Sequence, residues 1–146
     1  GLITQFLMAQ GNPMVKRVFA MGRGKSKEHG DPKDRYFLGM PQGRTIILED
    51  VTTTGDSLLH TLDQLVGAHV EVVAAITLTD RNQKRDDGKS ISQVLAERGI
   101  PFYAMSNALE LLPQAYDYEE IKPDAAIARA IEQEFREQGI SLNMIK

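Results

Sequence analysis

The sequence of 146 residues predicts an α/β domain with a parallel, twisted sheet and flanking helices. Two observations lead to this prediction. Short β-branched or apolar runs alternate along the chain with segments whose apolar residues repeat at helical spacing. The run over 70–78 is apolar at most positions, which is typical of a strand buried on both faces of a parallel sheet. We therefore expect right-handed crossovers between parallel strands.

The first third of the chain predicts two elements and a long excursion. Residues 2–10 have the apolar spacing of a short helix, which the Gly-Asn-Pro sequence at 11–13 ends because proline cannot continue a helix. Residues 14–21 alternate as a strand does. Residues 22–43 are rich in glycine and basic side chains and predict a loop or loose ribbon. A loop of this length in a compact domain is usually functional or disordered.

The middle of the chain alternates strand and helix. The β-branched run that begins at Arg44 predicts a buried strand, and the leucines from Leu58 onward predict a helix that Gly67 ends. The polar connection over 80–90 is expected to be a solvated turn at Asp86-Asp87-Gly88, with the alternative that the connection folds over a bound base. The predicted elements are a strand over 44–48, a helix over 58–66, a strand over 70–78, a helix over 91–98, a strand over 100–105 and a helical turn that ends at 112.

A C-terminal amphipathic helix is expected over about 123–138. Ile127, Ile131 and Phe135 recur every four residues and therefore share one face of this helix. This apolar stripe requires a partner surface, and the sheet or a second subunit is the simplest. The length suits one domain, and we expect residues 1–146 to form a single unit.

Composition excludes several classes of function. No apolar run approaches the roughly 18 residues of a membrane span and no leader pattern opens the sequence, so we expect a soluble, cytoplasmic protein with no membrane partner. The chain contains no cysteine, which excludes disulfides, thiolate metal sites and cysteine nucleophiles and fits a reducing compartment. Any catalysis must use oxygen and nitrogen groups.

The net charge of −3 hides a local basic segment. Residues 16–35 hold seven lysines and arginines against three acidic residues, while the rest of the chain is acidic. A short basic segment on an acidic protein suits one small, highly charged ligand better than a nucleic acid, so no nucleic-acid partner is expected.

The polar stretch over 49–57, Glu-Asp-Val-Thr-Thr-Thr-Gly-Asp-Ser, lies between a predicted strand and a predicted helix. Ligands of open α/β sheets bind at this end of the strands. Threonines, glycine and serine just before a helix offer hydroxyls and N–H groups to a phosphate, and the acidic pair suits sugar hydroxyls. The stretch therefore predicts a sugar-phosphate site. The same composition also fits a capped turn without a ligand, and Asp56 is unfavourable beside a phosphate unless it turns away.

This strand, acidic pair, threonine and glycine loop, and helix resemble the phosphoribosyl-diphosphate signature of type I phosphoribosyltransferases. The segment Arg-Gly-Lys-Ser-Lys-Glu-His-Gly at 23–30 resembles the mobile catalytic loop of orotate phosphoribosyltransferases, and Leu-Thr-Asp-Arg at 78–81 resembles the strand end that follows the signature. The resemblance covers about residues 1–112. It implies a type I phosphoribosyltransferase-like fold that is N-terminally incomplete, because the family carries a further segment before the position of Gly1.

The resemblance also implies roles for residues of this chain. Lys27, His29 and Arg23 match basic positions of the catalytic loop, where they would stabilise the departing pyrophosphate. Gly24 stands where the family usually has a second lysine, and Lys25 beside it is a candidate substitute. Arg81 corresponds to the arginine that contacts the carboxylate of orotate. The implied substrate-binding residues are Glu49, Asp50, Thr52, Thr53, Thr54, Gly55, Asp56, Ser57, Arg81 and Lys25, and Asp50 is counted with the catalytic residues as well.

The implied activity is transfer of ribose 5-phosphate from phosphoribosyl diphosphate to orotate. The resemblance further implies Mg²⁺ bound mainly through the diphosphate, since no dedicated carboxylate cage is present, and a homodimer with shared active sites. Two alternatives stay open: transfer to another base, such as a purine or uracil, and a non-catalytic module that binds phosphoribosyl diphosphate or a nucleotide.

Overall fold

The computed structural model describes residues 20–22, 37–39, 41–118 and 124–144. The helix expected over 2–10 and most of the strand expected over 14–21 lie outside these residues. The chain divides into two compact units, one of residues 1–45 and 61–72 and the other of residues 46–60 and 73–146, and each is described by itself. In the described part of the chain, no helix is long and apolar enough to cross a membrane.

A three-stranded parallel sheet holds the candidate site. Its strands are β3 (Arg44–Thr52), β4 (Glu71–Asp80) and β5 (Phe102–Asn107), in the order β3-β4-β5. The register of β4 and β5 runs from Ala75 opposite Phe102 to Asp80 opposite Asn107. The sheet confirms the predicted parallel α/β fold.

Each strand ends later in the chain than the sequence predicts. β3 continues to Thr52 rather than Leu48, so the acidic pair lies inside the strand and not in the connection after it. The reason is that Val51 and Thr52 are β-branched and favour the strand conformation, whereas the prediction ended the strand where the polar stretch begins. Because side chains alternate along a strand, Glu49 and Asp50 point to opposite faces of the sheet.

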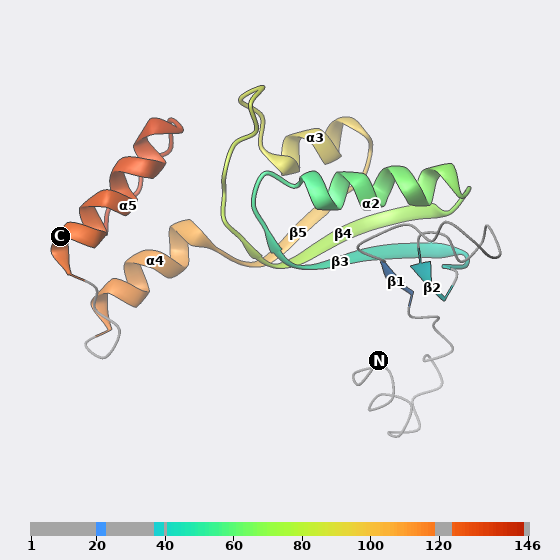
Figure 1. The fold of residues 1–146 in the computed structure, drawn as a ribbon, viewed down its shortest axis with the longest axis horizontal. Helices are drawn as coiled ribbons and strands as arrows, with labels where there is room; N and C mark the ends of the chain where they lie inside the picture. The colour runs from blue at the N-terminus through green and yellow to red at the C-terminus, as the bar shows by residue number, and fades with distance from the viewer. Residues whose placement is uncertain (1–19, 23–36, 40, 119–123, 145–146) are drawn as a thin grey trace, which may run out of the picture. The chain divides into compact units, whose positions relative to one another are not determined.

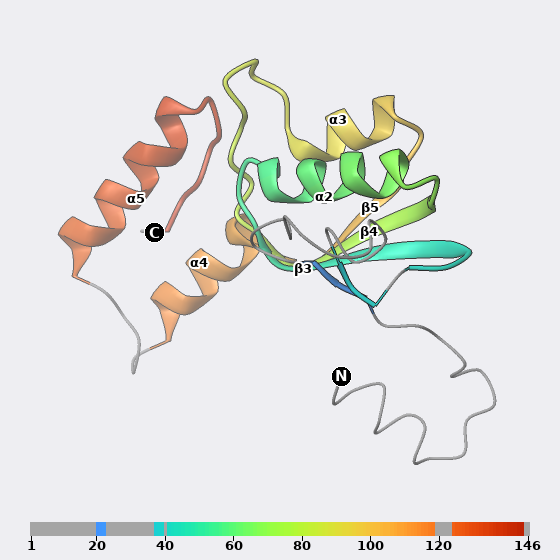
Figure 2. The same ribbon diagram turned by 45° about the vertical axis from the view of Figure 1, so that its right-hand side comes forward.

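The second strand of the sheet, expected to be buried on both faces, is fully buried on one face and only partly buried on the other, where Ala74 and Asp80 are buried. Ala75 and Thr77 are fully buried, whereas Leu78, on the other face, is 55% exposed, and Met105 in β5 is also exposed. Figure 1 and Figure 2 show α3 (Ile91–Glu97) on one face of the sheet, where it contacts β5. The apolar residues on the other face account for the continuous apolar run.

Two helices follow the strands β3 and β4. α2 (Asp56–Gly67) buries leucines at helical spacing, and α3 buries Ile91 and Leu95. A capping box begins α3: the Ser90 hydroxyl accepts a hydrogen bond from the Gln93 N–H at 3.2 Å, and the Gln93 side chain accepts one from the Ser90 N–H at 2.9 Å. The buried residues of α2 are Leu58, Leu59, Leu62 and Leu65.

The C-terminal part of the chain forms a cluster of its own. α4 (Ala108–Asp117) follows β5 directly, and α5 (Ala125–Glu137) is the expected amphipathic helix. Phe135 of α5 is buried together with Ala108 of α4 and with Leu142 and Met144 of the tail. Phe135 and Ile131 of the apolar stripe therefore pack against α4 and the tail rather than the sheet, while Ile127 of the same stripe is exposed. The sequence does not predict this packing because the tail is short and irregular.

The other unit contains a short antiparallel ribbon. β1 (Met21–Gly22) pairs with β2 (Phe37–Leu38), with Met21 opposite Leu38 and Gly22 opposite Phe37. These strands lie at the beginning and near the end of the excursion expected over 22–43, in agreement with a ribbon. Arg44 and Glu71 form an exposed ion pair at 3.8 Å in the same unit.

We expect the substitution Phe135→Ala to lower the free energy of unfolding by about 3 kcal/mol, because it leaves a cavity in the C-terminal cluster. Ile127→Ala on the same helix is the matched control, since Ile127 is 54% exposed and should change stability by less than about 0.5 kcal/mol. Chemical denaturation followed by circular dichroism measures both. Equal losses for the two variants would contradict the observed packing.

Candidate functional site

The carboxyl ends of β3 and β4 meet at the candidate site. The N–H of Arg81 donates a hydrogen bond to the Thr52 carbonyl at 2.8 Å, which joins the first residue after β4 to the last residue of β3. The loop predicted to bind phosphate starts directly after β3, and Arg81, predicted to contact the base, directly follows β4. The hydrogen bond therefore places the start of this loop beside Arg81. Arg81 itself is exposed at this edge of the sheet.

The acidic pair offers two carboxylates in different environments. Burial, reinforced by the charge of neighbouring Asp50, raises the pKa of the Glu49 carboxyl above 4.5, and a hydrogen bond from the Ser57 hydroxyl opposes the shift. Asp50 is exposed, and its Oδ1 accepts a hydrogen bond from the N–H of Val51 at 2.8 Å. When ionised, both carboxylates act purely as acceptors, as binding of sugar hydroxyls requires.

A tight loop over 53–55 links β3 to α2. Thr53 and Thr54 are partly exposed, and Gly55 has a left-handed backbone with φ of 82°. The side chain of Ile91, at the start of α3, fills the space beside Gly55, so that a Cβ at this position would overlap Ile91. Glycine is therefore required here both by conformation and by packing.

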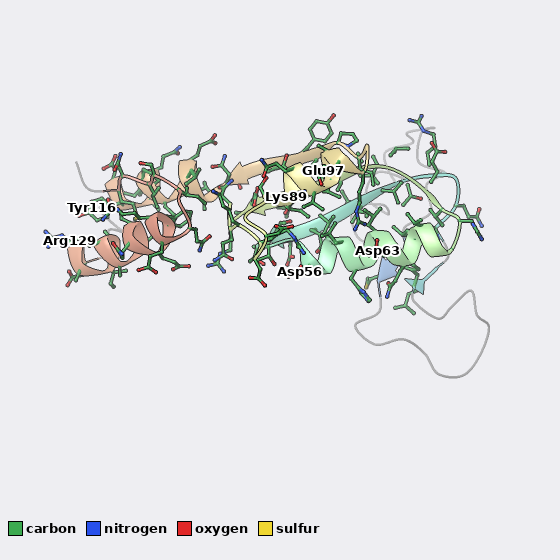
Figure 3. All side chains as sticks on the ribbon, turned by 90° about the horizontal axis from the view of Figure 1, so that it is seen from above. Asp56, Asp63, Lys89, Glu97, Tyr116 and Arg129 are labelled. Atoms are coloured by element: carbon green, nitrogen blue, oxygen red, sulfur yellow. The ribbon has the colours of Figure 1, made fainter. Side chains whose placement is uncertain are left out.

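Asp56 begins α2 and turns toward a side chain from the next connection. Its Oδ1 lies 2.6 Å from Nη1 of Arg85, and its Oδ2 accepts a hydrogen bond from the Thr54 hydroxyl at 2.8 Å. The hydrogen bond from Thr54 and then that from Arg85 lower the pKa of Asp56 below 3.8. Figure 3 labels Asp56 at this end of α2. From the sequence, Asp56 is expected to be unfavourable beside a phosphate. In the structure its carboxylate is paired with the Arg85 guanidinium, which compensates this negative charge.

Arg85 is the site residue that the sequence prediction missed. Its Nη1 also donates to the Thr54 carbonyl at 3.0 Å, so one nitrogen contacts two residues of the loop. A shallow cavity of about 200 Å³ lies at this junction, lined by Thr54, Asp56, Arg85, Asp86 and Asp87. The sequence predicts a solvated connection because basic and acidic residues are mixed in it, and no local pattern distinguishes Arg85 from its neighbours.

The connection that carries Arg81 and Arg85 is also tied to the C-terminal helix. Gln83 donates a side-chain hydrogen bond to Glu134 at 3.4 Å, and the N–H of Lys84 donates one to the Gln138 side chain at 3.3 Å. Farther along, Lys89 pairs with Glu97 of α3 at 2.7 Å, and Figure 3 shows these two side chains together. The connection is thus held at several points.

Two buried polar groups lie where β3 and β4 end. Thr52 is buried, and within the described residues its hydroxyl has no hydrogen-bond partner. Asp80 is also buried, and its Oδ1 accepts a hydrogen bond from the N–H of Asn82 at 2.9 Å. Burial raises the pKa of Asp80 above 3.8, and the hydrogen bond from Asn82 opposes the shift. The sequence prediction placed Thr52 among the substrate-binding residues, but the structure buries its side chain.

The predicted site residues divide into two groups. One group lies at the carboxyl end of the sheet and consists of the loop, the acidic pair before it and Arg81. Its members are Glu49, Asp50, Thr52, Thr53, Thr54, Gly55, Asp56, Ser57 and Arg81. The expected catalytic-loop residues Arg23, Lys25, Lys27 and His29 lie outside the described residues, and their roles stay predictions.

No family model matches the chain. It is 31% identical over 118 residues to the orotate phosphoribosyltransferase of Bradyrhizobium diazoefficiens, which covers 77% of this chain and 57% of that protein. It is 30% identical over 127 residues to the orotate phosphoribosyltransferase of Marinobacter nauticus, which covers 86% of this chain and 57% of that protein. The chain thus spans rather more than half the length of the curated relatives it matches.

A solved structure shares the fold. The orotate phosphoribosyltransferase of Mycobacterium tuberculosis superposes with a TM-score of 0.52 and 23% identity, over 63% of this chain and 49% of that one. At this identity the superposition shows that the two chains share a fold. The sequence is similar to curated orotate phosphoribosyltransferases over rather more than half of their length.

We expect Gly55→Ala to lower the free energy of unfolding by about 3 kcal/mol, because alanine is strained at φ of 82° and its Cβ overlaps Ile91. Gly67→Ala at the end of α2 is the matched control. A Cβ at Gly67 meets nothing within 4 Å and its φ is not positive, so this variant should be neutral or slightly stabilising. Thermal unfolding of both variants measures the difference. A neutral Gly55→Ala would show that Ile91 does not hold the loop.

Proposed function

We propose that the chain supplies the phosphoribosyl-diphosphate site of an orotate phosphoribosyltransferase. In this reaction the bond from C1 of the ribose to the pyrophosphate oxygen breaks, and a bond from C1 to a ring nitrogen of orotate forms. Orotidine 5'-phosphate and pyrophosphate are the products. One observation carries the proposal: the Arg81 to Thr52 hydrogen bond joins the loop suited to a sugar phosphate to the arginine suited to a carboxylate.

The described residues suit the two substrates in distinct ways. The loop over 53–55 precedes the N-terminus of α2, where N–H groups and hydroxyls favour the 5-phosphate. Glu49 accepts hydrogen bonds from the ribose hydroxyls when it is ionised, whereas Asp50 lies on the other face of β3. The planar guanidinium of Arg81 suits the carboxylate of orotate. The similarity to curated orotate phosphoribosyltransferases supports this choice of base.

The departing pyrophosphate requires positive charge, and the basic segment provides it in this proposal. Lys27 is the first candidate, with Arg23 and Lys25 beside it, and His29 would donate a hydrogen bond or a proton to the leaving oxygen. Movement of this loop would admit the substrates and then exclude water. We further propose a homodimer in which the loop of one subunit serves the site of the other, and a cytoplasmic location, which the absence of cysteine favours.

Magnesium is proposed to enter with the diphosphate. Among the residues the structure describes, no group of three or more acidic, histidine or cysteine side chains could hold a metal ion. The hard carboxylate oxygens of Glu49, on the face proposed for the ribose, nevertheless suit a Mg²⁺ ion that the diphosphate carries to it. When bound, this ion would neutralise part of the charge of the leaving pyrophosphate.

Orotate absorbance should fall when the protein receives orotate, phosphoribosyl diphosphate and Mg²⁺. Arg81→Ala should raise the KM for orotate about tenfold or more, because a charge-assisted hydrogen bond is lost, and it should leave the KM for phosphoribosyl diphosphate within about twofold. Product analysis with a panel of neutral bases is the control. Turnover of a purine or uracil in preference to orotate, or binding of phosphoribosyl diphosphate without turnover of any base, would overturn the proposal.

The KM for phosphoribosyl diphosphate should rise as the pH falls, because protonated Glu49 no longer accepts two hydroxyl hydrogen bonds. Since the pKa of Glu49 is raised above 4.5, this loss should begin at a higher pH than for an ordinary glutamate. Glu49→Gln should remove this part of the pH dependence and raise the KM at pH 7 by about tenfold. Protonation of the substrate is the same for both proteins, so the difference between the two pH profiles isolates Glu49. Identical profiles would exclude this role.

A further inference from the structure

A negative charge stands at the start of the helix that the phosphate loop leads into. Asp56 follows Gly55 directly, and its side chain is 71% exposed. A carboxylate here would repel a sugar phosphate bound on the loop, and the water around the exposed side chain would screen only part of that repulsion. The charge therefore has to be compensated for the loop to bind an anion well.

Arg85 is placed to compensate it. Its guanidinium is only 23% exposed, and Nη1 lies 2.6 Å from Oδ1 of Asp56 and 3.0 Å from the Thr54 carbonyl. A turn fixes the arginine, because its N–H donates to the Lys89 carbonyl at 3.0 Å and its carbonyl accepts from the N–H of Gly88 at 2.8 Å. The arginine therefore reaches the loop from a defined backbone position.

The other two acidic residues that line the cavity, Asp86 and Asp87, do not contact the loop through hydrogen bonds. Asp87 accepts a hydrogen bond from the N–H of Lys89 at 3.0 Å, within its own connection. Asp86 lines the cavity and makes no hydrogen bond to the loop residues Thr54 and Asp56. Asp56 is thus the acidic residue that belongs to the phosphate loop, and Arg85 is its cationic partner.

We propose that Arg85 is a positioning residue of the phosphate site, which cancels the charge of Asp56 and holds the Thr54 carbonyl away from the bound phosphate. This inference rests on the proposed function and adds a residue from the connection after β4 to it. The contact with the carbonyl matters because an unpartnered carbonyl oxygen would face the phosphate with a second partial negative charge. Arg85 contacts both the Asp56 carboxylate and the Thr54 carbonyl through Nη1. Within the described residues its Nη2 and Nε have no hydrogen-bond partner.

The test is a charge-rescue cycle on the complete chain. Arg85→Ala should raise the KM for phosphoribosyl diphosphate about tenfold, because the charge of Asp56 is then uncompensated. Adding Asp56→Asn to this variant should recover most of the loss, since asparagine removes the charge and keeps the shape. Arg85→Lys should lie between the wild type and Arg85→Ala, because lysine keeps the charge but not the fork of donors. If Arg85→Ala does not fold, Arg85→Gln takes its place in the cycle.

Lys89→Ala is the matched control, because it removes one positive charge from the same connection but pairs with Glu97 of α3. It should leave the KM within about twofold. Normal turnover with an unchanged KM in Arg85→Ala, or a double variant no better than the single one, would overturn the inference while the proposed function stands. Calorimetry with ribose 5-phosphate tests the role of Arg85 independently of turnover. If Arg85→Ala weakens binding and the added Asp56→Asn restores it, but the protein does not turn over orotate, the inference is supported and the proposed function is overturned.

Discussion

The hydrogen bond from the Arg81 N–H to the Thr52 carbonyl is the constraint on which the site depends. It fixes the ends of two neighbouring parallel strands at the same level, so that the segments leaving both strands start from a common edge. The loop over 53–55 leaves from one strand and the connection with Arg85 leaves from the other. Their meeting at Asp56 is a consequence of this alignment, because both segments are short and have little room to diverge.

Three carboxyl groups near this edge differ in pKa because their surroundings differ. Burial raises the pKa of Glu49 and of Asp80, whereas hydrogen bonds from Thr54 and Arg85 lower that of Asp56. Glu49 is accessible enough to accept hydrogen bonds from a ligand, and Asp80 is occupied by Asn82. The site therefore holds a half-buried carboxylate that is still open to a ligand, one that is neutralised by a partner and one that closes a turn.

The alternation of strands and helices follows from hydrophobic periodicity and was predictable, as was the Thr-Thr-Gly loop between β3 and α2, whose composition favours a turn before a helix. Three features were not. The length of β3 depends on β-branched residues beside charged ones, the uneven burial of the two faces of β4 depends on the elements that pack against it, and the cover of Phe135 comes from an irregular tail. Arg85 escaped prediction for a similar reason: its partners lie 29 and 31 residues away in the sequence, and no local pattern encodes such a pairing.

The two hydrogen bonds between the connection after β4 and α5 have an engineering consequence. Gln83 and the Lys84 backbone reach Glu134 and Gln138, so the segment between the two arginines is supported by a helix more than fifty residues farther along the chain. A connection transplanted from a relative to alter base preference would lose that support unless the matching face of α5 were moved with it. The segment and the helix are therefore best treated as one exchangeable module.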